Sequence, residues 1–223
     1  MNEEVVIVAI DGPSGVGKST TSRRAAVELK IPHIDTGAMY RAVALESIRQ
    51  ETDLDDESAV AKIAEEIDIE FRHVGSTPHV YLNGEDVSAS IRTSEVGMAA
   101  SKVSAFSPVR RRLVELQRQI GHSRGGVLEG RDIGTKVFPE TPHKFFLTAR
   151  PEVRADRRWK ELREKGVEES YESVLADLQK RDHQDSTRAD SPLTWDETYT
   201  VIDTSSLTID QVVERIVTSV LQA

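Results

Sequence analysis

The sequence of 223 residues contains no cysteine. Disulfide bonds, thiolate nucleophiles and cysteine–zinc sites are therefore excluded, and an intracellular location is permitted. The six histidines show no metal-ligand spacing. No apolar run approaches the roughly 20 residues that span a bilayer, and the acidic segment 1–4 does not resemble a targeting peptide. These absences predict a soluble cytoplasmic protein that has no membrane partner.

Positive charge is also scarce, because 29 Lys and Arg residues face 38 Asp and Glu residues, for a net charge of −9. This balance argues against a general polyanion binder, so we expect no nucleic-acid partner. The hydrophobic content of 38% allows a substantial core. The length suits one domain with insertions or two small domains.

The clearest motif is a glycine-rich segment that directly follows an apolar run at residues 5–10. Residues 12–19 fit G-x-x-x-x-G-K-[ST] at every fixed position, the pattern of a phosphate-binding loop. A buried strand would deliver the turn, and residues 19–29 would form a helix whose positive dipole end faces the anion. The alternative interpretation is a glycine-rich turn that happens to be followed by a lysine.

Each part of this motif has an expected task. The glycines permit positive φ and close approach of the backbone to phosphate, Lys18 reaches the β- and γ-phosphates, and the Ser19 hydroxyl holds Mg²⁺. The residues that we expect to bind the nucleotide phosphates here are Gly12, Pro13, Ser14, Gly15, Val16, Gly17, Lys18, Ser19 and Thr20.

A second polar corner follows a short strand predicted at residues 31–35. The side chains expected there are Asp35, Thr36, Tyr40 and Arg41, at the start of a helix. In an open parallel sheet this corner lies on the same carboxyl edge as the phosphate loop, where ligands bind. Alternatively, Asp35 or Thr36 is only a helix N-cap, and Arg41 is a solvated helix residue.

Residues 67–87 change character, because apolar and polar residues alternate around a tight turn at Asn83-Gly84. This pattern predicts a small antiparallel insertion. A helix over 93–105 and a second helix after Pro108 follow, and the arginines at 110–112 lie beside the buried stripe of the second helix. We expect at least two of these three arginines to be solvated.

Three further strands are predicted, at residues 144–148, at residues 199–203 and within residues 125–134, where the strand ends in a polar, glycine-rich loop; the last helix begins at the capping box of residues 208–211. Glu129 lies at the end of the strand within 125–134. An acid at this place in a phosphate-loop fold orients Mg²⁺ and its waters, so we interpret Glu129 as a metal-site residue acting through water. Its alternative role is a hydrogen-bond acceptor at the strand end.

Arginine is concentrated between the last two strands, in a helix that begins at Pro151. Arginine on a hinged segment over a phosphate loop suits a lid for phosphoryl transfer, because the transferring group must be neutralised and water excluded. The alternative is an exposed charged helix. A polar stretch over residues 181–188 follows the next helix.

Together these segments resemble the bacterial-type cytidylate kinase family of nucleoside-monophosphate kinases over nearly the whole chain. The matching segments are residues 10–18, 35–41, 91–96, 129–135, 181–185 and 188. The resemblance implies an α/β fold: a P-loop NTPase core whose five-stranded parallel sheet is flanked by helices, a monophosphate-binding insertion with a small antiparallel sheet, and a short lid. The implied boundaries are 1–35, 106–149 and 167–223 for the core, 36–105 for the insertion and 150–166 for the lid.

The resemblance also implies roles for matching positions. It places Ser101, Arg110 and Asp132 near the cytosine, Arg181 and Asp185 near the sugar, and Arg41, Arg131 and Arg188 near the acceptor phosphate, with Arg92 supporting the monophosphate. The lid residues Arg154, Arg157 and Arg158 resemble those that meet ATP. Lys18, Arg41, Arg131 and Arg158 are the expected catalytic residues. An alternative for Asp132 is that it only pairs with a nearby arginine such as Arg131.

The implied reaction is transfer of the γ-phosphoryl of Mg·ATP to CMP or dCMP by a monomeric enzyme. The acceptor is already ionised, so alignment and charge neutralisation suffice. A UMP kinase and a shikimate-type kinase are the alternatives within enzymes. A nucleotide-dependent switch or nucleic-acid ATPase is the alternative outside them, and the −9 charge and the arginine-rich layout weigh against it.

Overall fold

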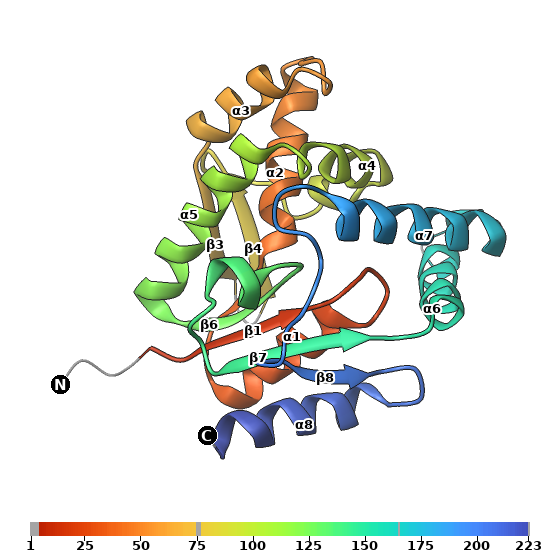
Figure 1. Cartoon of the computed structure of the whole chain (residues 1–223). Helices are drawn as coiled ribbons and strands as arrows, with labels where there is room; N and C mark the ends of the chain where they lie inside the picture. Colours follow the sequence, from red (N-terminus) through yellow and green to blue (C-terminus); the bar gives the residue numbers. More distant parts are fainter. Residues whose placement is uncertain (1–4, 75–76, 165, 223) are drawn as a thin grey trace. The chain divides into compact units, whose positions relative to one another are not determined.

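The computed structural model describes residues 5–74, 77–164 and 166–222. The chain divides into two compact units (Figure 1): unit 1 comprises Met1–His33 and Arg124–Ala223, and unit 2 comprises Ile34–Ser123. The boundaries expected for the core, the insertion at 36–105 and the lid at 150–166 stay predictions, and Lys165 within the lid lies outside the described residues.

A five-stranded sheet has the order β2-β6-β1-β7-β8, with β1 in the centre (Figure 1). β1 pairs in parallel with β6 and β7, and β7 pairs in parallel with β8. The strands are β1 (Ile7–Asp11), β2 (His33–Asp35), β6 (Gly126–Gly130), β7 (His143–Thr148) and β8 (Thr200–Asp203). The strand β1 is apolar and buried, as expected for a central parallel strand. The predicted α/β fold with a parallel five-stranded sheet is confirmed.

Two helices of unit 1, α1 (Lys18–Leu29) and α8 (Ile209–Leu221), pack against each other and against the sheet. Their apolar stripes share one core with the strands, including Ala25 of α1 and Ile216 of α8. α8 begins at the capping box predicted from the sequence, because Thr208 and Gln211 exchange side chain to backbone hydrogen bonds.

The helices α6 (Pro151–Glu164) and α7 (Tyr171–Thr187) pack as a hairpin in unit 1 (Figure 1). They have a small core of their own, formed by Ala155, Leu162, Val174 and Leu178. Trp159 packs against this core, and its indole N–H donates to the Glu169 carbonyl at 3.0 Å. The hairpin is therefore stabilised by contacts within itself.

The segment between α7 and β8 lies against strand β7. The Trp195 ring stacks on Phe146 with centroids 4.4 Å apart, and Tyr199 meets the same ring edge-on at 6.3 Å. Trp195 stays half-exposed, whereas Tyr199 is buried. Tyr199 is thereby fixed next to the end of β1, where the site begins.

Unit 2 contains helices and a separate antiparallel sheet of order β3-β4-β5. Its turn is the predicted Asn83-Gly84, where both residues have positive φ. The core includes Met39, Leu82 and Leu113. The elements are α2 (Thr36–Arg49), α3 (Glu57–Glu66), β3 (Ile69–Val74), β4 (Thr77–Leu82), β5 (Glu85–Asp86), η1 (Ser90–Arg92), α4 (Ser94–Val103) and α5 (Ser107–Arg124).

Candidate active site

The phosphate loop connects β1 to α1 in the order that the motif predicts. Gly12, Gly15 and Gly17 all have positive φ, as expected. At Gly12 the space is closed as well, because an added Cβ would lie 2.2 Å from the Leu147 carbonyl oxygen of β7. Only glycine fits there, because the first residue of the loop lies directly against the backbone of β7.

Lys18 is buried and turned toward its own loop. Its ammonium donates to the carbonyl oxygens of Gly12 and Pro13, both at 2.6 Å. Burial and the nearby charge of Arg131 lower the pKa of Lys18 well below its ordinary value, against the opposing effect of Glu129. A bound phosphate would stabilise the Lys18 cation more strongly than these two carbonyl groups, because it carries a full negative charge and they carry only partial charges.

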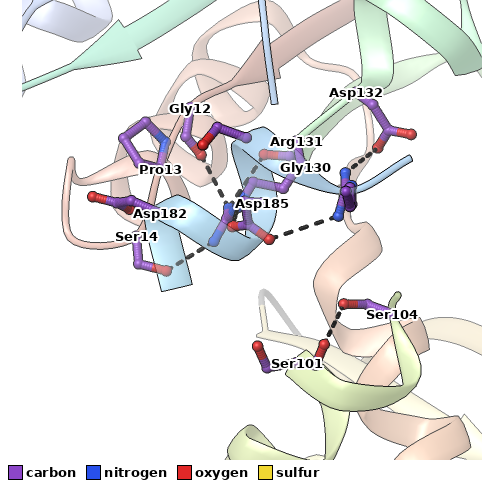
Figure 2. A network of polar contacts seen from close by, with 12 residues as sticks. Gly12, Pro13, Ser14, Ser101, Ser104, Gly130, Arg131, Asp132, Asp182 and Asp185 are labelled. Carbon is purple, nitrogen blue, oxygen red and sulfur yellow. Dashed lines mark hydrogen bonds and ion pairs between the residues drawn. The ribbon is translucent and has the colours of Figure 1, made fainter. Parts of the chain in front are cut away.

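Arg131 joins three parts of unit 1 through its guanidinium (Figure 2). Nη1 donates to the Gly12 carbonyl at 3.0 Å, Nη2 to the Ser14 hydroxyl at 2.8 Å, and Nε to the Asp185 carboxylate at 2.7 Å. Burial would lower the pKa of Arg131, but the ion pair with Asp185 outweighs it and raises the pKa. A planar cation is therefore held against the phosphate loop, as a phosphate clamp requires.

A second arginine completes this cluster of alternating charges. Arg188 lies with Nη1 3.6 Å from Asp185 and Nη2 4.0 Å from Asp132. Burial would raise the pKa of Asp185, but Arg131, followed by Arg188 and Arg181, holds it below its usual value. The proposed pairing of Asp132 with an arginine thus occurs with Arg188, whereas Arg131 engages Asp185.

Glu129 is the penultimate residue of β6 in unit 1 and is almost fully buried. Its carboxylate accepts hydrogen bonds from the Ser19 hydroxyl at 2.9 Å and lies 3.1 Å from the Nε2 atom of His33. Two hard oxygen donors, Ser19 and Glu129, therefore meet beside Lys18, a donor set that suits Mg²⁺. Sequence reasoning missed His33, because a lone histidine in a strand carries no pattern.

The three lid arginines differ in how they are held. Arg154 is buried and donates to the Ser14 carbonyl at 3.1 Å and to Asp182 at 2.6 Å. Arg157 donates twice to Thr204, whose hydroxyl in turn donates to the Val16 carbonyl at 3.1 Å. Arg158 pairs with Glu161 and is partly exposed, as Arg157 is, whereas Arg154 is buried. Sequence reasoning missed Asp182 and Thr204 because their partners are distant in the chain.

Unit 2 brings together its own set of predicted residues at the start of α2. Asp35 caps this helix by accepting from the Ala38 N–H, as one interpretation expected, and it also pairs with Arg92 at 2.9 Å. Thr36 begins the helix. Arg41 donates to the Ile91 carbonyl at 3.1 Å, and Gly97 faces its guanidinium, where an added Cβ would lie 3.1 Å from Nη1.

Arg110 is the largest fully buried side chain of α5. Its guanidinium lies 5.4 Å from the centre of the Tyr40 ring and donates to the Ser104 carbonyl at 3.1 Å. The Ser101 carbonyl accepts from the Ser104 hydroxyl at 2.8 Å (Figure 2). Arg111 is exposed and Arg112 is half-buried, so only one of the three arginines of this run is fully exposed, fewer than expected.

Asp11 was not singled out by the sequence, although it is an acid at the end of an apolar strand. It is fully buried at the last position of β1, and it accepts hydrogen bonds from Ile133, Gly134 and Tyr199. Burial raises the pKa of Asp11 from its ordinary 3.8 to about 6, against the opposing effect of these donors. Asp11 therefore ionises only at a cost in folding free energy.

Titration of Asp11 is expected to lower stability as pH rises from 3.8 to about 6. The unfolded chain releases this proton at lower pH than the folded protein does, and the shift corresponds to about 3 kcal/mol of unfolding free energy. Urea unfolding of wild type and Asp11→Asn over this range checks it: the stability of wild type relative to the variant should fall. A difference independent of pH would contradict the shift, and Asp210→Asn at the exposed start of α8 is the control.

The described part of the chain contains no group of three or more His, Asp or Glu side chains placed to hold a metal ion. Among the same residues, no helix is long and apolar enough to cross a membrane.

Comparison with known proteins places the chain in a family. The family model described as cytidylate kinase matches residues 8–222. The chain belongs to the cytidylate kinase family. A cytidylate kinase of Syntrophotalea carbinolica is 48% identical over 215 residues, 96% of this chain and 91% of the relative. A cytidylate kinase of Clostridioides difficile is 43% identical and covers 96% of this chain and 98% of its own length.

One solved structure shares the fold of this chain at a much lower sequence identity. An uncharacterised protein from Eubacterium ventriosum covers 98% of this chain and 99% of its own, with a TM-score of 0.56 at 12% identity. At that identity the similarity supports the fold alone. The family assignment therefore depends on the sequence matches, and the resemblance inferred from the motifs is confirmed.

Proposed function

We propose that this kinase transfers the γ-phosphoryl group of Mg·ATP to the 5′-phosphate of CMP or dCMP, giving ADP and CDP or dCDP. Membership of the cytidylate kinase family across residues 8–222 carries the proposal. The geometry of unit 1 supports it, because Lys18 and Arg131 both point at the backbone of the phosphate loop. These are the cations that a phosphoryl group in transfer would require.

The donor nucleotide is assigned to the phosphate loop, from Gly12 to Thr20. Bound Mg²⁺ would be held by the Ser19 hydroxyl and, through water, by Glu129, and it would neutralise charge on the phosphates. The loop N–H groups and the start of α1 would bind the phosphate oxygens. Arg154, Arg157 and Arg158 are assigned to ATP, and Arg158 pairs with Glu161 of its own helix.

The acceptor nucleotide is assigned to residues of both units by the family resemblance. Arg41, Arg131 and Arg188 would neutralise its phosphate, with Arg92, Asp35, Thr36 and Tyr40 supporting that end. Arg181 and Asp185 would hold the sugar, and Ser101, Arg110 and Asp132 the cytosine. Because the acceptor phosphate is ionised, catalysis requires alignment and charge neutralisation and no general base.

Residues 150–166 are proposed to act as a lid that closes over both nucleotides, since the helix α6 carries Arg154 and Arg158 and packs with α7 around a small core of its own. Closure would exclude water and prevent ATP hydrolysis without an acceptor. We also propose that the enzyme acts as a monomer in the cytoplasm, where its nucleotide substrates occur.

The test is ATP consumption with CMP, dCMP, UMP, AMP and shikimate as separate acceptors. CMP or dCMP should give the fastest turnover, and UMP should give less. Fast turnover with shikimate, or none with any acceptor, would contradict the proposal. ATP hydrolysis that requires a protein or nucleic-acid partner would instead support a switch or a nucleic-acid ATPase.

Replacing Asp132 with Asn should weaken the choice of cytosine over uracil. An ionised carboxylate only accepts, which suits the cytosine N4 amine, whereas an amide also donates to the uracil O4 carbonyl. Such a contact is worth about 1–3 kcal/mol, or about 10- to 150-fold in discrimination. The ratio of kcat/KM for CMP over UMP measures the change.

The control for this experiment is Asp210→Asn, which changes an exposed carboxylate on α8. It should leave the ratio at the wild-type value. An unchanged ratio in a folded and active Asp132→Asn enzyme would limit Asp132 to its ion pair with Arg188.

A further inference from the structure

The Asp11 carboxylate connects three segments of unit 1 without a role in the proposed function. Oδ1 accepts from the Ile133 N–H at 2.9 Å, and Oδ2 accepts from the Gly134 N–H at 2.9 Å and the Tyr199 hydroxyl at 2.8 Å. Ile133 begins the short π-helical turn η2 (Ile133–Val137), directly after Arg131-Asp132. One buried side chain at the start of the phosphate loop therefore holds the backbone that follows two proposed site residues.

The contacts between these segments run in both directions. The Asp11 side chain holds the backbone just after Arg131-Asp132, and the Arg131 side chain donates to the carbonyl of Gly12, the residue after Asp11. Each segment thus fixes the other through a side chain to backbone hydrogen bond. Loss of the Asp11 contacts would leave Arg131 attached to a turn that is free to shift.

The third segment leaves little room for that shift in the wild-type protein. A Cβ added at Gly134 would lie 2.6 Å from the Tyr199 hydroxyl oxygen and 3.0 Å from Lys144 Cγ. The turn therefore packs tightly on Tyr199, which the stacked rings of Phe146 and Trp195 hold in place. The hydroxyl is fixed where it donates to Asp11.

The energetics indicate that packing is not the reason for an acid at this position. The neighbouring residues Ala9 and Ile10 are apolar and fully buried, whereas an apolar side chain at position 11 would remove the acceptor of two backbone N–H groups and of the Tyr199 hydroxyl. Burial raises the pKa of Asp11 to about 6, so the ionised form at neutral pH carries a cost. Such costs concentrate at functional sites.

We propose that Asp11 is a positioning residue for the acceptor nucleotide. Its carboxylate holds the turn that follows Arg131-Asp132, so that Arg131 meets the acceptor phosphate and Asp132 meets the base in register with the phosphate loop. This inference rests on the proposed function of Arg131 and Asp132, and it assigns Asp11 no contact with either nucleotide.

The test compares Asp11→Asn with wild type in steady-state kinetics. The Asn side chain has the same shape as Asp. Its NH₂ group, however, replaces a carboxylate oxygen that accepts from the turn or from Tyr199, so a donor would face a donor and the turn should shift. Misplacement of about 1 Å can cost about 100-fold, and we expect kcat/KM for CMP to fall about 10- to 100-fold. The preference for CMP over UMP should fall as well, whereas the dissociation constant of ATP should stay close to the wild-type value.

Two further variants separate positioning from loss of stability. Tyr199→Phe removes one donor and keeps the ring packing, so kcat/KM for CMP should fall about 2- to 10-fold with ATP binding unchanged. Thr141→Val is the matched control, since the buried Thr141 hydroxyl donates to the Ile7 carbonyl at the other end of β1. It should lower the melting temperature and leave the CMP-to-UMP preference unchanged.

The outcomes distinguish this inference from the proposed function. Wild-type enzyme that does not phosphorylate CMP would contradict the function. Wild-type CMP preference in folded Asp11→Asn, or in Tyr199→Phe if Asp11→Asn does not fold, would overturn the inference. An equal loss of ATP and CMP affinity would also overturn it, because Asp11 would then support the whole loop.

Amide hydrogen exchange at Ile133 and Gly134 tests the inference without substrate. Exchange should accelerate in Asp11→Asn and in Tyr199→Phe and not in Thr141→Val. Unchanged exchange in the first two variants would overturn the inference.

Discussion

Lys18→Met should lower kcat by about 100- to 1,000-fold, because preorganised charge on a transferring phosphoryl group is worth several kcal/mol. The ammonium is the charged end of a buried side chain, and it lies 2.6 Å from the Gly12 and Pro13 carbonyl oxygens of the phosphate loop. Methionine fills the same stem volume and removes the charge. Turnover of saturating ATP and CMP measures the loss.

Stability should change little in the same variant. Burial already disfavours the Lys18 cation, and the Gly12 carbonyl keeps its hydrogen bond from Arg131 after the substitution. The control is Lys30→Met at the exposed end of α1, which should retain wild-type turnover. Near-normal turnover in folded Lys18→Met would remove Lys18 from phosphoryl transfer.

Arg131→Lys should lower kcat/KM for CMP by about 100-fold or more while the charge is preserved. The guanidinium donates in three directions at once, to Gly12, Ser14 and Asp185. An ammonium on a flexible stem cannot reproduce this planar arrangement, so the cation would no longer be held where the acceptor phosphate arrives. Kinetics with varied CMP at saturating ATP measures the effect.

A surface substitution of the same kind provides the comparison. Arg24 pairs with Asp210 on the outside of unit 1, and Arg24→Lys should be kinetically silent. If Arg131→Lys were equally silent, charge alone would suffice at this position and the fork geometry would be irrelevant.

Local sequence signals were sufficient to predict several turns and helix ends of the fold. The phosphate loop, the Asn83-Gly84 turn and the capping box at Thr208 all occur where residue chemistry placed them. These features depend on contacts within a few residues, so a linear pattern contains them. The division at Ser123 and Arg124 depends instead on packing of α5, which no local pattern records.

The candidate site was predictable only as far as motifs extend. Lys18 belongs to a sequence motif and Glu129 lies at a predicted strand end, so both could be proposed from the sequence alone. His33, by contrast, lies 96 positions from Glu129 in the chain, and Asp182 meets Arg154 across 28 positions. Such partners are chosen by the folded arrangement of strands and helices, so their roles become visible only in three dimensions.

The two tryptophans of this chain occupy separate places in unit 1: Trp159 packs against the core of the α6–α7 hairpin, and Trp195 stacks on Phe146. Intrinsic fluorescence therefore contains two signals with distinct origins. A variant with Trp195 replaced by Phe would emit from Trp159 alone and report on the hairpin in a stopped-flow mixing experiment. The reverse variant, which retains Trp195, would report on the segment that fixes Tyr199. The protein thus carries built-in optical probes of its proposed lid and of its sheet edge, with no need for an attached dye.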